Sequence, residues 1–272
     1  MTKVIGQHKI VETFSTYTFK SMPTSLLLLG PKGSGKHFLA SELANQLGVD
    51  LVELTSKTTS EELLEILQSP VVRLCWIDLT EVDEKAQNKF LKFIEEPPSA
   101  LKVLLGAESE GGILPTILNR CLKLTLESYT EAELRQFSWT PEFCDSRLFK
   151  FCNTPGKLLV LNTAADFQQI ERVCLQLVTQ LPQYEAYNYA NVMTLATRIN
   201  CKKAEQQKWD MDLFLDVFAD TAFENYKTSK APFSLEAYKL VTSYKKQLIN
   251  KTLNKEAFML SFFNDLWRIA HI

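Results

Sequence analysis

The sequence predicts an α/β protein in which a five-stranded, mainly parallel sheet lies between helices and an all-helical region follows. The first observation is residues 26–39, LLLLGPKGSGKHFL, where a run of leucines leads into a glycine-rich turn. Such a run is typical of a strand buried on both faces, and the apolar residues after the turn recur at helical spacing. The second is that strand-like runs and helical patterns alternate up to residue 127, which favours parallel pairing. The third is that the chain is helical by pattern from residue 166 onward.

The glycine-rich turn has the spacing G-x-x-x-x-G-K of a phosphate-binding loop. Its glycines allow backbone N–H groups to converge on phosphate oxygens at the start of a helix, and Lys36 supplies a positive charge. A Ser or Thr whose hydroxyl ligates Mg²⁺ normally follows this lysine. Here His37 follows it, and imidazole is a poor ligand for a hard cation, so the loop fits phosphate better than catalysis. The expected phosphate-binding residues are Gly30, Pro31, Lys32, Gly33, Ser34, Gly35, Lys36 and His37.

Composition limits the class of protein. The chain has 272 residues with 30 basic and 32 acidic side chains, so any DNA contact is expected to be shared with partners or confined to one face. No apolar run approaches the length of a membrane span and the N-terminus has no apolar signal core, which predicts a cytoplasmic protein without membrane contact. The 6 cysteines form no C-x-x-C pair and several fall in apolar runs, so we expect reduced core cysteines and neither zinc nor disulfides.

The elements nearest the loop are predicted from local patterns. A helix precedes the loop, since apolar residues recur at helical spacing over residues 10–17. The helix that follows the loop ends near Gly48, and residues 50–55 alternate as a second strand. Thr59 and Glu62 form a capping box that opens a short helix.

Residues 71–78 are an apolar run that ends on an aspartate. This is the Walker B form, in which the carboxylate of Asp78 at the carboxyl end of a strand reaches the metal beside the phosphate loop. Residues 86–94 predict a helix that buries one apolar face and is stopped by a double proline. Strands at residues 102–106 and 122–126 complete the sheet.

Three stretches carry a resemblance to a known family. Residues 86–98, AQNKFLKFIEEPP, closely resemble the A-Q-N-A-L-L-K-x-L-E-E-P-P signature of the DNA polymerase clamp-loader ATPases of the AAA+ class. Residues 114–121, LPTILNRC, resemble the family's L-P-T-I-x-S-R-C motif at the expected distance, with Asn119 in place of the serine. Residues 4–7 resemble the family's opening I-I-G-Q, which lies against the adenine. On this ground the residues expected to contact the nucleotide are Val4, Ile5, Gly6 and Gln7.

The resemblance, which covers roughly residues 1–165, implies a division into three domains. Residues 1–127 would form the nucleotide-binding domain, and residues 128–165 a small helical lid that opens with a second T-x-x-E capping box. The sequence NTPGKLL at residues 153–159 is similar to the lid turn G-S-P-G-K-A-L of the family. Residues 166–272 would form an all-α collar that packs subunits into a ring, and we expect its many aromatic residues mainly in its core.

The resemblance also implies which parts of an ATPase site remain. Phosphoryl transfer to water needs phosphate positioning, a metal, a residue that orients water and charge stabilisation. Lys36 and Asp78 are kept, whereas the hydroxyl metal ligand, the water-polarising carboxylate, the polar sensor and the lid arginine are all changed. Because removing one such group lowers the rate about 10²- to 10³-fold, no useful turnover is expected. The residues at the changed positions are His37, Leu79, Ala107 and Gly156.

Arg120 stands where the family has an arginine finger, which stabilises charge on the ATP of the neighbouring subunit. A changed site with an intact finger is similar to the delta-prime stator of bacterial clamp loaders or a phage counterpart, although residues 48–70 lack the four-cysteine zinc module usual there. The implied partners are other clamp-loader subunits, the sliding clamp and primer–template DNA, with Lys85 and Lys89 as candidate DNA contacts. We expect weak binding of ATP or ADP, poor Mg²⁺ binding and no zinc or other metal site.

Two other interpretations stay open. In one, the chain is an active clamp-loader ATPase in which His37 and a carboxylate such as Glu81 replace the missing groups. In the other, an AAA+ module serves a different assembly, since a fold does not determine a function.

Overall fold

The computed structural model describes residues 4–82, 84–95, 97–137, 146–160, 164–182, 194–195, 209–248 and 254–271. The chain forms two compact units. One consists of residues 1–140 with 153–159, and the other of residues 141–152 with 160–272. Each unit is described by itself below, as the sheet unit and the helical unit. The division into three domains at residues 127 and 165 stays a prediction.

The sheet unit contains a 5-stranded sheet of order β2-β3-β4-β1-β5, in which all neighbouring strands pair in parallel. This confirms the predicted fold class. β1 lies between β4 and β5, so the loops that follow β1, β3 and β4 leave the sheet at the same edge. The strands are β1 (Ser25–Leu29), β2 (Asp50–Leu54), β3 (Arg73–Asp78), β4 (Leu101–Ala107) and β5 (Leu122–Thr125).

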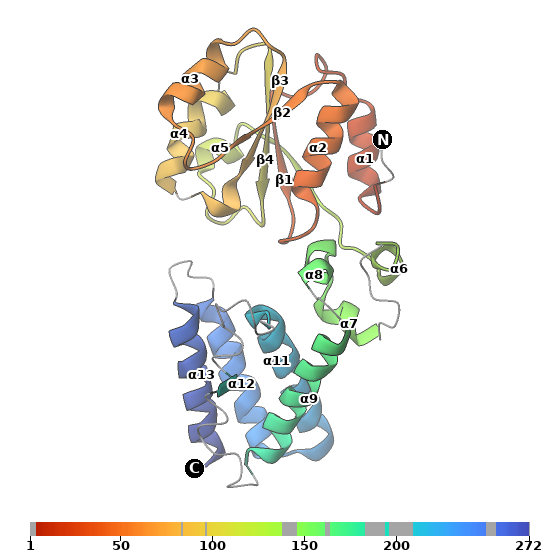
Figure 1. Cartoon of the computed structure of the whole chain (residues 1–272), viewed down its shortest axis with the longest axis vertical. Helices are drawn as coiled ribbons and strands as arrows, with labels where there is room; N and C mark the ends of the chain where they lie inside the picture. The colour runs from red at the N-terminus through yellow and green to blue at the C-terminus, as the bar shows by residue number, and fades with distance from the viewer. Residues whose placement is uncertain are drawn as a thin grey trace. The chain divides into compact units, whose positions relative to one another are not determined.

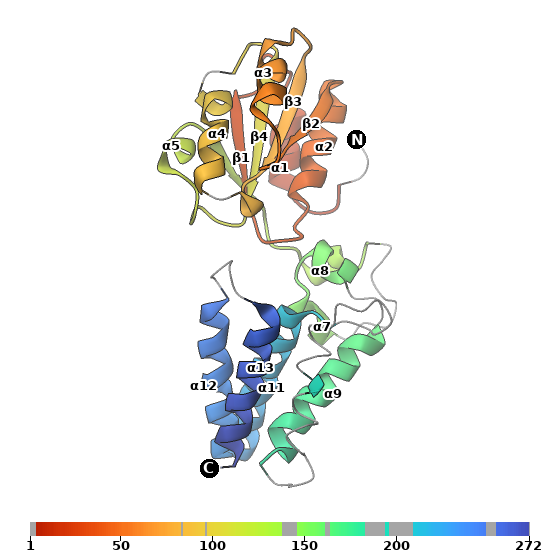
Figure 2. The same ribbon diagram turned by 60° about the vertical axis from the view of Figure 1, so that its left-hand side comes forward.

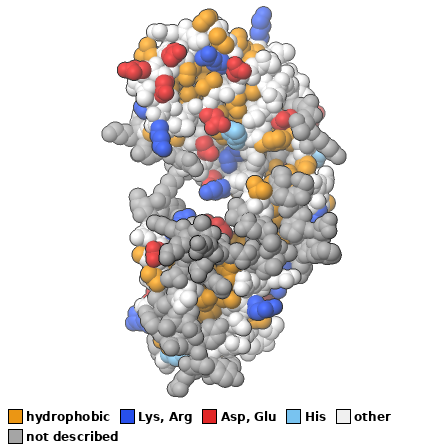
Figure 3. All heavy atoms as spheres, viewed as in Figure 1, with side chains coloured by type: hydrophobic (Ala, Val, Ile, Leu, Met, Phe, Trp, Pro, Cys, Tyr) orange, Lys and Arg blue, Asp and Glu red, His pale blue; other side chains and the backbone are white. Residues whose placement is uncertain are grey.

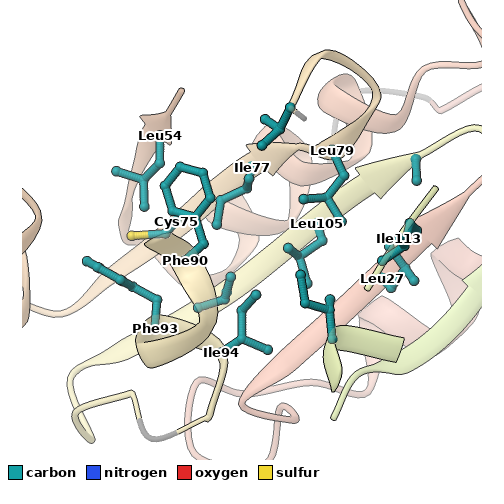
Figure 4. Packing of buried hydrophobic residues seen from close by; sticks show 14 of the residues in the cluster. Leu27, Leu54, Cys75, Ile77, Leu79, Phe90, Phe93, Ile94, Leu105 and Ile113 are labelled. Atoms are coloured by element: carbon teal, nitrogen blue, oxygen red, sulfur yellow. The ribbon is translucent and has the colours of Figure 1, made fainter. Parts of the chain in front are cut away.

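Helices cover both faces of this sheet, as Figures 1 and 2 show. Successive leucines of β1 point to opposite faces: Leu26 and Leu28 pack with α1 and α2, and Leu27 and Leu29 with α3, α4 and α5. Figure 4 shows Phe90, one of the α4 side chains on the second face. The helices are α1 (His8–Ser15), α2 (Lys36–Leu47), α3 (Ser60–Gln68), α4 (Glu84–Glu95) and α5 (Pro115–Leu118).

Both predicted capping boxes are present. Thr59 accepts from the backbone N–H of Glu62 at the start of α3, and Glu62 in turn accepts from the N–H of Thr59. Thr130 and Glu133 repeat the arrangement at α6 (Glu131–Leu134). These reciprocal bonds fix where each helix begins.

The third strand is shorter than predicted. The apolar run begins at residue 71, but β3 begins at Arg73, where pairing with Asp50 of β2 begins. Val71 and Val72 precede this register and are exposed. Their apolar character is therefore not a sign of burial.

The helical unit is built on long helices that lie side by side (Figure 2). Its core is rich in aromatic side chains, as predicted: Phe214, Phe218, Phe262 and Phe263 are all fully buried. Phe218 and Phe262 meet edge to face with ring centroids 5.6 Å apart. The helices are α7 (Ser146–Phe151), α9 (Ala164–Gln180), α11 (Met211–Ser229), α12 (Pro232–Gln247) and α13 (Lys255–Ala270).

The four cysteines in the described part of the chain form no disulfide. Burial raises the pKa of the Cys75 thiol to about 12 and that of Cys121 to about 11. Cys144 and Cys201 lie outside the described residues. In the same described ranges, no helix combines the length and apolar character that a membrane crossing needs.

Gly106 of β4 provides a test of packing in the sheet unit. A methyl group added at this residue would lie 2.4 Å from Cη2 of Trp76, which is itself 4% exposed. We expect Gly106→Ala to lower the free energy of unfolding by roughly 1–3 kcal/mol, because an overpacked core must shift. Urea denaturation followed by circular dichroism measures the change. Gly111→Ala is the matched control, since the nearest atom there is Ser109 Oγ at 3.5 Å, and equal stability of the two variants would contradict the prediction.

Candidate functional site

The phosphate loop joins β1 to α2 through glycines in the left-handed conformation. φ is +76° at Gly33 and +90° at Gly35, values that L side chains rarely adopt. Gly35 is the N-cap of α2 and no side chain caps this helix. Left-handed glycines before an uncapped helix N-terminus leave N–H groups that suit an anion. The backbone geometry therefore fits a phosphate group.

Lys36 lies beneath the loop and is 8% exposed. Its Nζ donates hydrogen bonds to the carbonyl oxygens of Gly30 at 2.7 Å and Pro31 at 3.1 Å. Burial lowers the pKa of the ammonium, while the nearby carboxylates of Asp78 and Glu108 act in the opposite direction. A phosphate that uses this lysine therefore competes with the carbonyl groups of the loop itself.

His37, at the position of the metal-ligating hydroxyl, is held by residues of β2 and β3. Its Nε2 lies 2.6 Å from Oε1 of Glu53, and its ring meets the ring of Trp76 edge on, with centroids 5.7 Å apart. The imidazole thus bonds to a carboxylate of the second strand rather than to a group of the loop. That His37 does not serve as a magnesium ligand stays a prediction.

Asp78 lies at the carboxyl end of β3, as predicted for a Walker B carboxylate. Its Oδ1 accepts a hydrogen bond of 2.9 Å from the N–H of Thr80, at the start of the short 3₁₀ helix η1 (Leu79–Glu81). Leu79 is 3% exposed and packs in the core with Ile77 and Leu105 (Figure 4). The position expected to polarise water therefore faces apolar side chains.

The end of β4 contributes a residue that sequence reasoning missed. Ala107, expected at the sensor position, is 3% exposed, and its carbonyl accepts from the N–H of Gly30 at 3.0 Å. Glu108 is the next residue and is exposed, and its carboxylate acts on the pKa of Lys36. Its place directly after a strand beside the loop was the signal that could have identified it.

The segment expected to contact adenine is bonded within the protein. Gln7 is 2% exposed, and its side-chain amide donates to the carbonyl of Glu127 at 2.7 Å and accepts from the N–H of Glu127 at 2.8 Å. Gly6 lies under the ring of Tyr129, where an added methyl group would be 3.1 Å from Cε1. Val4 and Ile5 are partly buried. The amide side chain of Gln7 is therefore already bonded, through both its donor and its acceptor, to the backbone of Glu127.

The lid position is also filled by the chain. Gly156 stands where the resemblance places an arginine, and it belongs to α8 (Pro155–Val160). Its N–H donates to the carbonyl oxygen of Gly33 at 2.9 Å. A backbone contact thus occupies the place of a charged side chain.

Arg120 lies at the surface of the sheet unit, just after α5. Its side chain is 43% exposed. One guanidinium nitrogen donates to the carbonyl of Thr116 at 2.9 Å, and the other lies 3.2 Å from Oε1 of Glu95. The side chain of Arg120 is therefore positioned by a carbonyl of α5 and by a carboxylate at the end of the signature helix α4.

The signature helix α4 also carries a buried amide. Gln87 is 1% exposed; its Nε2 donates to the carbonyls of Val82 at 3.3 Å and Gly112 at 2.8 Å, and its Oε1 accepts from the N–H of Leu114 at 3.0 Å. Sequence reasoning used this residue only for the resemblance. It fastens the loop that leads to Arg120.

The candidate DNA contacts lie on the same helix. Lys89 is exposed, and its Nζ donates to the carbonyl of Thr58 at 3.0 Å. Lys85 belongs to α4, but its side chain is outside the described part of the chain, as is that of Glu81 in η1.

Comparison with known proteins adds family relationships to this geometry. A family model described as "DNA polymerase III, delta subunit" matches residues 72–130, the range that holds β3, α4, β4, α5 and β5. The DNA polymerase III subunit gamma of Buchnera aphidicola subsp. Acyrthosiphon pisum is 27% identical over an alignment of 169 residues, and the match covers 49% of this chain and 47% of that protein. Subunit tau/gamma of Haemophilus influenzae is 29% identical over an alignment of 114 residues, and the match covers 39% of this chain and 17% of that protein. The chain thus matches about half, or less, of the length of these relatives.

A crystal structure of a DNA polymerase III gamma subunit-related protein from Thermotoga maritima shows the same fold. It matches with a TM-score of 0.52 at 13% sequence identity, covering 97% of this chain and 99% of that chain. The strand order and the phosphate loop define the class as AAA+ P-loop proteins. The family model and these relatives are all named as DNA polymerase III subunits, so the chain is similar in sequence to the clamp-loader AAA+ proteins. The matches name delta, gamma and tau/gamma subunits, so the delta-prime assignment stays a proposal.

We expect Gln87→Leu to lower the free energy of unfolding by roughly 2–4 kcal/mol, because it leaves buried backbone groups without partners. The N–H of Leu114 donates to the side chain of Gln87, so in this variant its amide hydrogen exchange should accelerate more than exchange in β1. Lys92→Ala, an exposed position on the same helix, is the control and should change neither quantity appreciably. Normal exchange at Leu114 in Gln87→Leu would show that the amide does not fasten this loop.

Proposed function

We propose that this chain is a non-hydrolysing subunit of a DNA sliding-clamp loader in DNA replication, comparable to the delta-prime stator. Arg120 would act as an arginine finger in the site of a neighbouring ATPase subunit. The other loader subunits, the sliding clamp and primer–template DNA are the proposed partners. The observation that carries the proposal is a contrast within one unit: packing contacts fill the chain's own catalytic positions, while the side chain of Arg120 is 43% exposed.

Among the described residues, the two positions expected to activate water and stabilise charge carry no suitable group. Leu79 lies in the core and Gly156 bonds through its backbone to the loop, so neither supplies a carboxylate or a cation. His37 is bonded to Glu53. A nucleotide bound at the loop would bring the phosphates, with Lys36 and the N–H groups at the start of α2 to hold them. The residues that drive its hydrolysis are not in place among those described.

Arg120 can exchange its present partner for a phosphate at small cost. An ion pair between exposed side chains, such as Arg120 with Glu95, contributes about 0.2–1 kcal/mol. An arginine finger contributes a factor of about 10³ to 10⁵ in rate, or roughly 4–7 kcal/mol. The stabilisation that a finger gives the transition state is therefore larger than the resting ion pair by several kcal/mol.

The charge distribution supports DNA contact within an assembly rather than by the chain alone. Formal net charge is −2, and the described face in Figure 3 shows Lys and Arg side chains mixed with Asp and Glu. Non-specific DNA affinity depends on the release of counterions by clustered basic groups. Lys89 is the exposed basic residue of α4 that stays a candidate contact, and Lys85 stays one by sequence alone.

We expect the purified chain to hydrolyse ATP no faster than its Lys36→Ala variant, with or without primed DNA. The reason is that Leu79 and Gly156 replace groups that activate water and stabilise charge. Steady-state phosphate release is the measurement. A turnover of about one per second, typical of active phosphoryl-transfer enzymes, that disappears in Lys36→Ala would contradict the proposal and favour the active-ATPase interpretation with His37 and Glu81.

We expect Arg120→Ala to leave folding and assembly intact and to depress both ATP hydrolysis and clamp loading by the reconstituted loader. The site that the finger serves should lose a factor of about 10³ to 10⁵, while the total rate falls by that site's share unless the sites act cooperatively. Arg135→Ala is the matched control, because Arg135 has a side chain 39% exposed and pairs with Glu131. Wild-type loading and hydrolysis by Arg120→Ala loaders would show that Arg120 is an ordinary surface residue.

A further inference from the structure

The outer side of the phosphate loop is covered by hydrogen bonds from two other segments of the sheet unit. Three consecutive carbonyl groups at the tip of the loop each accept one bond, and the two carbonyls before them accept from Lys36. Each backbone carbonyl of the loop from residue 30 to residue 34 therefore accepts a hydrogen bond from another group of the protein. The three tip bonds run from Thr154 Oγ1 to Lys32 (3.1 Å), from Gly156 N–H to Gly33 (2.9 Å) and from Tyr129 O–H to Ser34 (3.0 Å).

The segment of residues 153–159 touches the loop backbone to backbone. A methyl group added at Gly156 would lie 2.5 Å from Cα of Gly33, and one added at Gly33 would lie 2.9 Å from Cα of Gly156. Thr154 is 1% exposed, so its hydroxyl is sealed within this contact. Such an approach is open only to a pair of glycines.

Tyr129 links the phosphate loop to the N-terminal segment. Its ring lies against Gly6, and its hydroxyl bonds to the loop. The backbone just before it, at Glu127, is paired with the side chain of Gln7. The loop, the N-terminal segment and residues 153–159 are thus joined to one another by the chain itself.

We infer that Tyr129, Thr154 and Gly156 form a latch that keeps the phosphate loop closed without a nucleotide and decides which ligand the loop accepts. An inorganic anion meets only the N–H groups at the start of α2, which the latch leaves open. A nucleotide also needs room beside the loop for its ribose and base, and Tyr129, Thr154 and Gly156 already contact the loop there, so the latch disfavours it. The inference deepens the proposed function and rests on it, because it concerns the ligand of the site proposed not to hydrolyse ATP.

Hydrogen exchange of the full chain, read by mass spectrometry, tests the latch. In the wild type, we expect the amides of residues 30–36 and 153–159 to be protected without ligand. Millimolar Mg·ADP should not change their exchange, whereas inorganic phosphate should slow it at residues 33–37. Gly156→Ala should exchange at least about tenfold faster in both segments and should gain protection on adding ADP, since each net hydrogen bond contributes about a factor of five. Leu159→Ala is the control, because Leu159 lies in the same segment and is 61% exposed.

A second variant covers the case in which Gly156→Ala does not fold. Tyr129→Phe with Thr154→Val removes two tip bonds while keeping the shape of both side chains, and roughly 20-fold faster exchange of residues 30–36 is expected. Wild-type exchange in this variant, or in a folded Gly156→Ala, overturns the latch. Protection of the wild-type loop by ADP overturns the ligand choice, as does its failure to respond to phosphate. All readings come from the isolated chain, so they are distinct from any failure of assembly or of the arginine finger.

Discussion

The place of β1 in the sheet is the constraint on which the functional geometry depends. This strand is paired on both edges, by β4 and β5, and all its residues are buried. The point at which the loop leaves the strand is therefore fixed by both neighbouring strands and both layers of helices. Parallel pairing then brings the ends of β3 and β4 to the same edge, which is why Asp78 and Glu108 act on the pKa of Lys36. The position of the loop, and of the charged groups near it, is therefore set by the core.

Around this loop, residues with structural contacts lie at the positions where the resemblance implies groups of an ATPase site. Leu79 adds to the hydrophobic core, His37 joins Glu53 to the edge of the Trp76 ring, and Gly156 bonds to the loop. Each replacement contributes to stability where the expected residue would contribute to catalysis. Arg120 differs because its contacts lie at the surface, where an ion pair is weak and its partner is readily exchanged.

Local signals made much of this fold predictable from sequence, and long-range contacts made the rest unpredictable. The leucine strand β1 and the capping boxes at Thr59 and Thr130 are each predicted by residues close together in the sequence, and the structure confirms them. The bond from Tyr129 to Ser34 joins residues 95 positions apart, and no periodicity or motif indicates it. The same holds for Gln87. In the sequence it is one residue of the family signature, whereas in the structure its three hydrogen bonds hold the loop that leads to Arg120.

The close approach of Gly33 and Gly156 also limits the paths open to sequence change. An arginine at residue 156 would carry a Cβ 2.5 Å from Cα of Gly33, so a lid arginine becomes tolerable only after the two backbones have separated. A change at Gly33 is opposed in turn by its φ of +76°. Substitutions at residues in such contact are strongly non-additive. Placing an arginine at residue 156 therefore requires concerted change at several sites rather than a single substitution.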